Sequence, residues 1–308
     1  MTIAPHSSRP RLGPAAGRLL ALLVAGLLWA GPAAHAQPTA DTSRIVTLGG
    51  AATEIVYALE AGEQVVGVDP SSVYPAAATE KPSVGYFRRL PAEGVLSLDP
   101  SLILALEGTG PPSVLDQLRS AGVRVELVPD EPSVDGARKK IRRIAGLLGR
   151  EARADPLVQR MEADLAAARA LRGEVSSEPR VLFIYARGSG TMSVAGTGTS
   201  AEAMIELAGA ENAITGFEGF KPMSAEAVVG AEPDVLLLLT RGLESIGGVD
   251  GLLDQPGIAL TPAGENRRIV AMDDLLMLGF GPRLGTAVKE LTRKLHPELD
   301  APSSAARN

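Results

Sequence analysis

Two stretches of this sequence repeat one another at a fixed distance. AEGVLSLDPSLILAL begins at Ala92, and AEAVVGAEPDVLLLL begins at Ala225, 133 positions later. The offset pairs Glu93 with Glu226, and in both stretches a short helical pattern leads through a proline into an apolar strand. A weaker echo, TEIVYALEAG and AEAMIELAG, comes earlier in each half and pairs Glu54 with Glu202. This repetition predicts two lobes of similar fold.

Strand and helix patterns alternate on both sides of a central helical region. In the first half, RIVTLGG, SLILAL and VRVELVP are typical of buried strands with helical segments between them. In the second half, RVLFIYA, DVLLLL and RRIVAMD continue the alternation. Such an order is typical of an α/β protein whose parallel sheets are covered by helices. We therefore predict two similar α/β lobes with parallel sheets, joined by a single long helix, with a ligand cleft between the lobes.

The same patterns divide the chain into six segments. Within the connecting region, Gly149 and Pro156 interrupt the helical pattern, and apolar positions three and four apart after Asp155 predict one long surface helix. The predicted segments are a signal peptide (1–36), a leader (37–43), an N-terminal lobe (44–132), a connecting helical segment (133–178), a C-terminal lobe (179–296) and a disordered tail (297–308).

The first 36 residues have the layout of a secretory signal peptide. Arg9, Arg11 and Arg18 precede an apolar run over 19–30, and small residues lead to a cleavage site after Ala36. A membrane anchor is the alternative, but a span needs about 20 apolar residues, more than this run contains. The chain has no cysteine, so it offers neither a disulfide nor a thiol for a lipid anchor. We predict a protein free in the periplasm.

Charge and residue usage narrow the classes of function. Loss of residues 1–36 would move the formal charge from -6 to about -9, which argues against nucleic acid as a partner. It would leave His296 as the only histidine, which disfavours an enzyme and a bare transition-metal site. A secreted hydrolase with a serine between Ser189 and Ser200 stays an alternative, although RGSGTMSVAGTGTS lacks the G-x-S-x-G order and the lysine of a phosphate-binding loop.

Tyr86 stands beside two arginines in KPSVGYFRRLPAEGVLSLDP. A phenolate oxygen is an axial ligand to haem iron in some proteins, but a free phenol ionises only near pH ~10, so it needs help from a nearby cation. In an extended segment Arg88 would lie on the same side as Tyr86 and supply that charge, while Arg89 could pair with a carboxylate of the ligand. The same residues also suit a tyrosine packed at a loop rim beside solvated arginines.

Further stretches complete a recognisable pattern. GYFRRLPAEGVLSLDPSLIL, RIVTLGGAATEIVYAL, TRGLESIGGVDGLLDQPGIALTPAGENRRIVAMDDLLMLGFGPRL and the central helix together resemble the periplasmic haem-binding proteins of bacterial ABC importers, the HmuT type of helical-backbone substrate-binding protein. The likeness runs from Arg44 to Leu295. The tyrosine motif and LLMLGFGPRL are its specific parts, because the two lobes alone would also fit cobalamin and ferric-siderophore carriers.

The resemblance implies a role for seven residues. Tyr86 falls on the axial iron ligand and Arg88 on the arginine that supports it. Further contacts with the haem are expected for Arg89, Arg241 and Arg283, and docking on the permease for Glu93 and Glu226.

The resemblance also implies the cargo and the partners. A monomer would bind haem b and deliver it to an inner-membrane ABC permease dimer with its ATPase. Some relatives hold a second haem with a histidine of the second lobe, and because this chain has none there, we expect one haem per chain. Apolar lining is expected, from position alone, from Met192, Met223, Phe217, Phe220, Met272 or Met277.

Overall fold

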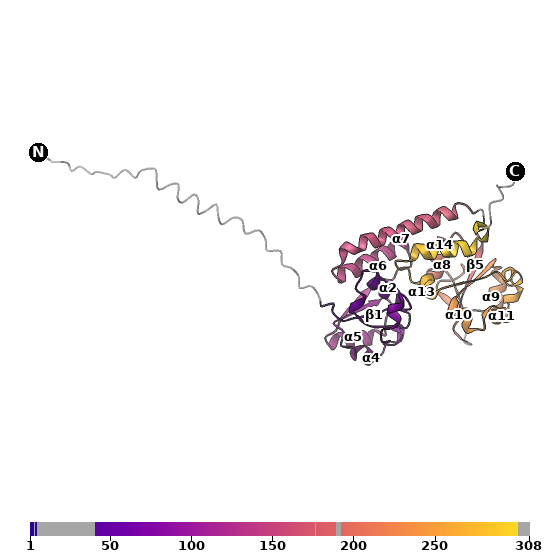
Figure 1. Cartoon of the computed structure of the whole chain (residues 1–308), viewed down its shortest axis with the longest axis horizontal. Coiled ribbons are helices and arrows are strands. Elements are labelled where there is room, and N and C mark those ends of the chain that lie inside the picture. The colour runs from indigo at the N-terminus through magenta and orange to yellow at the C-terminus, as the bar shows by residue number, and fades with distance from the viewer. Residues whose placement is uncertain (3, 5–40, 176, 189–191, 301–308) are drawn as a thin grey trace. The chain divides into compact units, whose positions relative to one another are not determined.

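The computed structural model describes residues 1–2, 4, 41–175, 177–188 and 192–300 (Figure 1). Met1–Thr39 and Ala40–Asn308 form separate units, and every helix and strand below belongs to the second. Nearly all of the predicted signal peptide, including its cleavage site, lies outside the described residues, as do Ser189 and residues 301–308. In the part of the chain that is described, no helix has both the length and the apolar character needed to cross a membrane.

The first lobe is built on sheet A, in which all strands are parallel. Its central strands, with the sequences IVTL and LILAL, are buried along their whole length, as expected for a parallel sheet covered on both faces. Ile45 pairs with Val65 on one side and with Leu102 on the other. The strand order is β2 (Val65–Val68), β1 (Ile45–Leu48), β3 (Leu102–Leu106) and β4 (Arg124–Val128).

The second lobe is built on sheet B, which contains a parallel core of the same order. Strand β5 pairs in parallel with β7 and β9, and β9 with β10, as β1 pairs with β2 and β3 in sheet A. Two short strands, β6 and β8, add antiparallel pairs that the prediction of parallel sheets did not include. The strands are β5 (Arg180–Tyr185), β6 (Ser193–Ala195), β7 (Glu211–Asn212), β8 (Phe220–Pro222), β9 (Val235–Leu239) and β10 (Ile269–Met272).

The backbone confirms the sequence repeat at the turns that enter matching strands. Asp99 and Glu232 lie 133 positions apart, and both have a positive φ, of 45° and 43°. This conformation is uncommon for residues other than glycine. The chain therefore turns in the same way ahead of β3 and ahead of β9.

An arginine at the start of each central strand, Arg44 just before β1 and Arg180 as the first residue of β5, repeats the same contact. The guanidinium of Arg44 donates to the carbonyl of Leu98, and the guanidinium of Arg180 donates to the carbonyl of Ala231. Leu98 and Ala231 are again 133 positions apart. The predicted similarity of the two lobes thus extends to individual hydrogen bonds.

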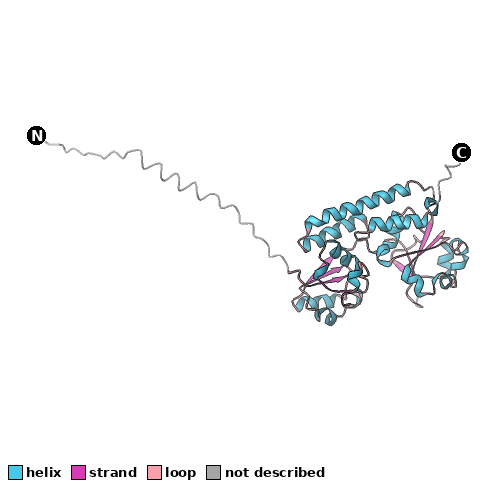
Figure 2. Cartoon of the chain, in the orientation of Figure 1, coloured by secondary structure: helices cyan, strands magenta, loops and turns pink. Residues whose placement is uncertain are grey.

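Helices cover both sheets, and three of them run together along the side that joins the lobes (Figures 1 and 2). These three are α6 (Val134–Leu147), α7 (Glu151–Arg172) and α14 (Leu284–Leu295). The others are α2 (Gly50–Ala58), α3 (Ala76–Thr79), α4 (Ala92–Leu96), α5 (Pro112–Ser120), α8 (Ser200–Leu207), α9 (Ala225–Gly230), α10 (Thr240–Ser245), α11 (Gly248–Leu253), α12 (Pro262–Glu265) and α13 (Asp274–Leu278). Four 3-10 turns are η1 (Gly62–Gln64), η2 (Phe87–Arg89), η3 (Ile258–Leu260) and η4 (Pro297–Asp300).

The connecting segment contains the predicted long helix as α7, with α6 ahead of it. It consists of two helices that meet at Gly149, whose φ of 63° ends α6. Pro156 lies inside α7 and does not end it, although a proline there cannot donate the helical hydrogen bond to the Ala152 carbonyl. Residues 297–300 form η4, which corrects the predicted start of a disordered tail at residue 297.

One hydrophobic core crosses both lobes. It joins Ile45 of β1, Ile141 of α6, Met161 of α7 and Phe183 of β5, all 0% exposed. Smaller cores lie on the other faces of the two sheets, around Leu236 in the second lobe and Ile103 in the first. The two lobes therefore share their main apolar interior with the connecting helices.

Candidate functional site

Tyr86 lies in a short loop that is fixed at both ends. Val84 and Leu90 are buried in the core of the first lobe, and the Val84 N–H donates to the Val68 carbonyl at the carboxyl end of β2. The Leu90 N–H donates to the carbonyl of Gly110, just beyond the end of β3. Between these anchors Tyr86 is 36% exposed. Ligands of parallel α/β sheets bind beyond the carboxyl ends of the strands, which is where this loop holds the phenol.

Arg88 is placed differently from the extended geometry that the sequence suggested. Residues 87–89 form the 3-10 turn η2, so alternation along a strand does not set the direction of the Arg88 side chain. The ring of Phe87 contacts both groups, with its centroid 5.0 Å from that of Tyr86 and 5.0 Å from Arg88 Cζ. Arg88 also approaches Gly108, where a Cβ would be only 3.2 Å from Nη1. Arg88 and Arg89 are both exposed.

Arg241 follows the carboxyl end of β9 in the second lobe. Its Nε donates to Asp274 Oδ2 at 3.2 Å, and Asp274 follows the end of β10. The arginine side chain is 54% exposed and the aspartate 15%. The pair therefore lies beyond the carboxyl ends of β9 and β10 in sheet B. No hydrogen bond or ion pair joins Arg241 to the loop of Tyr86 among the described residues.

Arg283 is held by the first lobe although it belongs to the second. Its Nε and Nη2 donate to the two carboxylate oxygens of Glu54, both at 2.9 Å. Burial of the guanidinium lowers the pKa of Arg283, but the hydrogen bond and charge of Glu54 outweigh burial and raise this pKa above its usual value. The guanidinium also lies 3.6 Å from the centroid of the Tyr74 ring. Arg283 is thus fixed at the junction of the lobes.

Glu93 and Glu226 occupy equivalent places in the two lobes. Each is an exposed residue in the first turn of a short helix, α4 or α9. A carboxylate there is favoured by the partial positive charge of the helix start. Within the described part of the chain neither glutamate forms an ion pair, so both charges are available to a partner.

The residues expected to line the cleft differ in how deeply they are buried. Met272 and Met277 are 0% exposed in the core that crosses the lobes, and Met192 is buried in the core of the second lobe. These three are packing residues, which corrects the expectation. Phe217 and Met223 pack half-buried against the same second-lobe core. Phe220 is 46% exposed, because β8 lies at the edge of sheet B.

Sequence reasoning missed four residues that the fold brings to these edges. Glu54 and Tyr74 contact Arg283 from positions far away in the chain, and no local pattern reveals such a contact. Tyr185 and Arg187 could have been found, because they repeat the Tyr-x-Arg spacing of Tyr86. Arg187 Cζ lies 5.6 Å from the ring centroid of Tyr185, at the carboxyl end of β5.

The serine alternative lacks catalytic partners among the described residues. Ser193 lies on β6, and Ser200 begins α8, where Thr199 accepts a hydrogen bond from Glu202 as the helix cap. His296 is buried at the end of α14, with Nδ1 3.2 Å from Glu298 Oε1. In the described part of the chain, no group of three or more metal-binding side chains comes together.

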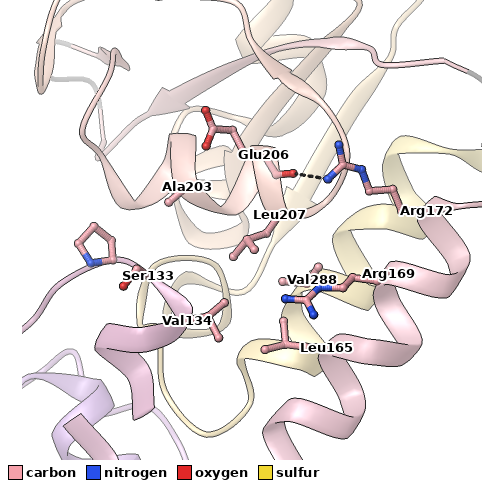
Figure 3. A pocket seen from close by; sticks show the side chains of 10 residues that line it. Ser133, Val134, Leu165, Arg169, Arg172, Ala203, Glu206, Leu207 and Val288 are labelled. Carbon is pink, nitrogen blue, oxygen red and sulfur yellow. Dashed lines mark hydrogen bonds between the residues drawn. The ribbon is translucent and has the colours of Figure 1, made fainter. Parts of the chain in front are cut away.

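A cavity of about 320 Å³ is lined by none of the seven predicted site residues (Figure 3). It is bordered by α7, α8, α14 and the start of α6, and Arg172 on its rim donates to the Glu206 carbonyl at 3.4 Å. Tyr86 and Arg241 lie instead beyond the carboxyl ends of strands in sheets A and B. The cavity is lined by Pro132, Ser133, Val134, Leu165, Arg169, Arg172, Ala203, Glu206, Leu207 and Val288.

Several solved structures of similar fold are haem-binding proteins. RhuT of Roseiflexus sp. RS-1, a periplasmic haem-binding protein in apo form, is 49% identical with a TM-score of 0.81, covering 84% of this chain and 100% of that chain. BhuT, a periplasmic haem-binding protein in complex with two haems, is 43% identical with a TM-score of 0.78, covering 83% and 98%. The two-lobed α/β fold is therefore shared with binding proteins of known structure.

Relatives in sequence include a protein that binds a different ligand, cobalamin. YvrC of Bacillus subtilis, an ABC transporter substrate-binding lipoprotein, is 31% identical over 84% of this chain and 81% of its own length. A cobalamin-binding protein of Halobacterium salinarum is 32% identical over 64% of this chain and 54% of its own length. The model of the periplasmic binding protein family matches residues 45–276, which span both sheets. This match, with the two-lobed fold, makes the chain a member of the periplasmic binding protein family.

Proposed function

We propose that this protein captures haem in the periplasm through Tyr86 and delivers it to an inner-membrane ABC permease dimer with its ATPase. The observation that carries the proposal is the 49% identity to the haem-binding protein RhuT over the whole of that chain. The cobalamin-binding relative matches at 32% identity over 54% of its length. Haem is therefore favoured, and cobalamin is the second candidate.

The geometry of the first lobe supports a tyrosine ligand to iron. Tyr86 is exposed in a loop with fixed ends, so the iron bond would require little ordering of the chain. Arg88 lies in the same loop and brings a positive charge to it, with its guanidinium 5.0 Å from the centroid of the Phe87 ring. One oxygen donor is enough here, because the porphyrin already supplies four ligands to the iron.

The rest of the site supports a flat, apolar cargo with anionic groups. Phe220 is 46% exposed and offers aromatic surface to a macrocycle. Burial of the apolar surface of the cargo contributes about 25 cal/mol to binding for each Å² removed from water. Arg89 and Arg241 would pair with the haem propionates, which are carboxylates.

Titration with haemin tests the proposed cargo. We expect the Soret absorbance to shift and to saturate at one equivalent, with a second equivalent behaving as free haemin. Cyanocobalamin in excess should leave the spectrum of the complex unchanged. Displacement of haemin by equimolar cyanocobalamin would favour the second candidate.

A titration that saturates at two equivalents would contradict the stoichiometry but not the cargo. Tyr185 would then be the first residue to replace, because it repeats the spacing of Tyr86 to the following arginine. The spectrum of Tyr185→Phe at one and two equivalents would show which of the two haems it contacts.

Glu93 and Glu226 are the proposed contacts with the permease. We expect Glu93→Ala/Glu226→Ala to bind haemin as the wild type does, while haem uptake into vesicles that contain the cognate permease falls roughly tenfold or more, since truncated charge pairs at interfaces cost that much affinity. Each single variant should show an intermediate loss.

The matched control is Glu80→Ala/Glu265→Ala. It also removes one exposed glutamate from each lobe, so it changes the net charge by the same amount. Equal losses of uptake in the two double variants would mean that overall charge, rather than two specific contacts, governs docking.

A further inference from the structure

Arg283 joins the two lobes through a pair of parallel hydrogen bonds. It precedes α14, yet both of its bonds, from Nε and from Nη2, go to Glu54 of α2, 229 positions earlier. Glu54 is 5% exposed and Arg283 is 25% exposed. A bidentate pair of this kind fixes the plane of the guanidinium as well as its position.

Tyr74 fixes the same guanidinium from a second direction. Its ring centroid lies 3.6 Å from Arg283 Cζ, which is the distance of direct stacking. Glu54 constrains one edge of the guanidinium and Tyr74 constrains one face, and both belong to the first lobe. Arg283 therefore moves with the first lobe, although its chain neighbours come from the second.

The segment before Arg283 is attached to the first lobe and to the connecting helix α6 as well. Lys140 of α6, 0% exposed, donates from Nζ to the Gly279 carbonyl at 3.2 Å and pairs with Asp130. Leu275 packs so closely on Gly50 that a Cβ there would lie 2.8 Å from its Cδ1. These contacts prevent the segment from carrying Arg283 away from Glu54.

One edge of the guanidinium stays available. Nε and Nη2 bond to Glu54, whereas Nη1 has no hydrogen-bond partner among the described residues and is not one of their enclosed polar atoms. A guanidinium has five N–H donors, so Nη1 can still bind a carboxylate while the other edge is occupied. The exposed quarter of the side chain is consistent with such a contact.

We infer that Glu54 and Tyr74 are positioning residues, which hold Arg283 at the junction of the lobes so that Nη1 binds a carboxylate of the cargo. This inference rests on the proposed function and adds to it that the cargo is selected for a carboxylate at this point. Glu54 acts through Arg283 and does not contact the cargo itself.

The inference is tested by comparing the affinity for haemin with the affinity for haemin dimethyl ester, which has no free carboxylate, in the same detergent. Arg283→Met should weaken haemin binding roughly ten- to a hundredfold, which is the effect of losing a charge-assisted hydrogen bond. The affinity for the ester should stay unchanged. Glu54→Gln should weaken haemin about tenfold, as expected for a residue that orients a binding group. Tyr74→Leu should cause a smaller loss, again for haemin alone.

Whether Glu54→Gln weakens or strengthens haemin binding distinguishes positioning of Arg283 from simple charge attraction. Removal of a negative charge near an anionic cargo would by Coulomb attraction alone strengthen binding, whereas loss of positioning weakens it. Asp116→Asn is the control, because it also removes a first-lobe carboxylate paired with an arginine, but from an exposed pair. It should leave both affinities unchanged.

Two outcomes overturn the inference. One is a Glu54→Gln protein that binds haemin as tightly as the wild type or more tightly; the other is an equal loss for haemin and ester in the three variants. Should Glu54→Gln fail to fold, Tyr74→Leu decides, because it keeps the ion pair. A wild-type protein that binds neither haemin nor its ester would instead refute the proposed function.

Discussion

Tyr86→Phe is expected to bind haemin at least about a hundredfold more weakly than the wild type, more than the loss typical of residues outside the first coordination shell of a metal. The substitution keeps the ring and removes only the oxygen that would bind iron. No cysteine exists to replace it, and His296 is buried at the end of α14. The absorbance spectrum of the ferric complex should also lose its phenolate character.

Tyr57→Phe is the matched control for this experiment. Tyr57 also lies in the first lobe, and its hydroxyl donates to the Ala77 carbonyl at 3.2 Å. Removing that hydroxyl should leave the haemin spectrum and affinity as they are in the wild type. Identical spectra and affinities for Tyr86→Phe and the wild type would show that another group binds the iron.

Arg283→Met is expected to lower the free energy of unfolding by about 3–5 kcal/mol, the usual cost of removing one partner of a buried ion pair. The Glu54 carboxylate, 5% exposed, would remain without its partner. Glu54→Leu/Arg283→Met removes both charges and should recover most of that loss, because it leaves no uncompensated charge. Urea unfolding, followed by circular dichroism, measures the free energy of unfolding of the wild type, the single variant and the double variant.

Arg119→Met provides the comparison for stability. Arg119 pairs with Asp116 on α5, and the two side chains are 43% and 74% exposed. Exposed pairs contribute at most about 1 kcal/mol, so this variant should unfold nearly as the wild type does. An Arg283→Met protein as stable as Arg119→Met would mean that the Glu54 pair does not hold the lobes together.

The sequence was most informative about the fold where the signal was periodic or repeated. The 133-residue repeat predicted matching lobes, and the backbone repeats even the positive φ of Asp99 at Glu232. Strands β6 and β8 were not predicted, because strands of three residues in a glycine-rich region give no periodic signal. A short turn of three residues likewise changed the expected direction of Arg88.

The site could be predicted only in part. Tyr86 and Arg88 are neighbours in the chain, so their association was visible as a motif. The contact of Arg283 with Glu54 spans 229 positions and depends on how the last third of the chain folds back over α2. No local pattern marks such a contact, and only the fold brings these residues to the junction of the lobes.

The core that crosses both lobes has a consequence for modularity. A repeat of this length suggests two halves that fold alone, but Phe183 of the second half shares one apolar interior with Ile45 of the first. Either half by itself would expose that interior to water, and burial of apolar surface is the main force that keeps a chain folded. The halves are alike in backbone, yet each is structurally incomplete without the other.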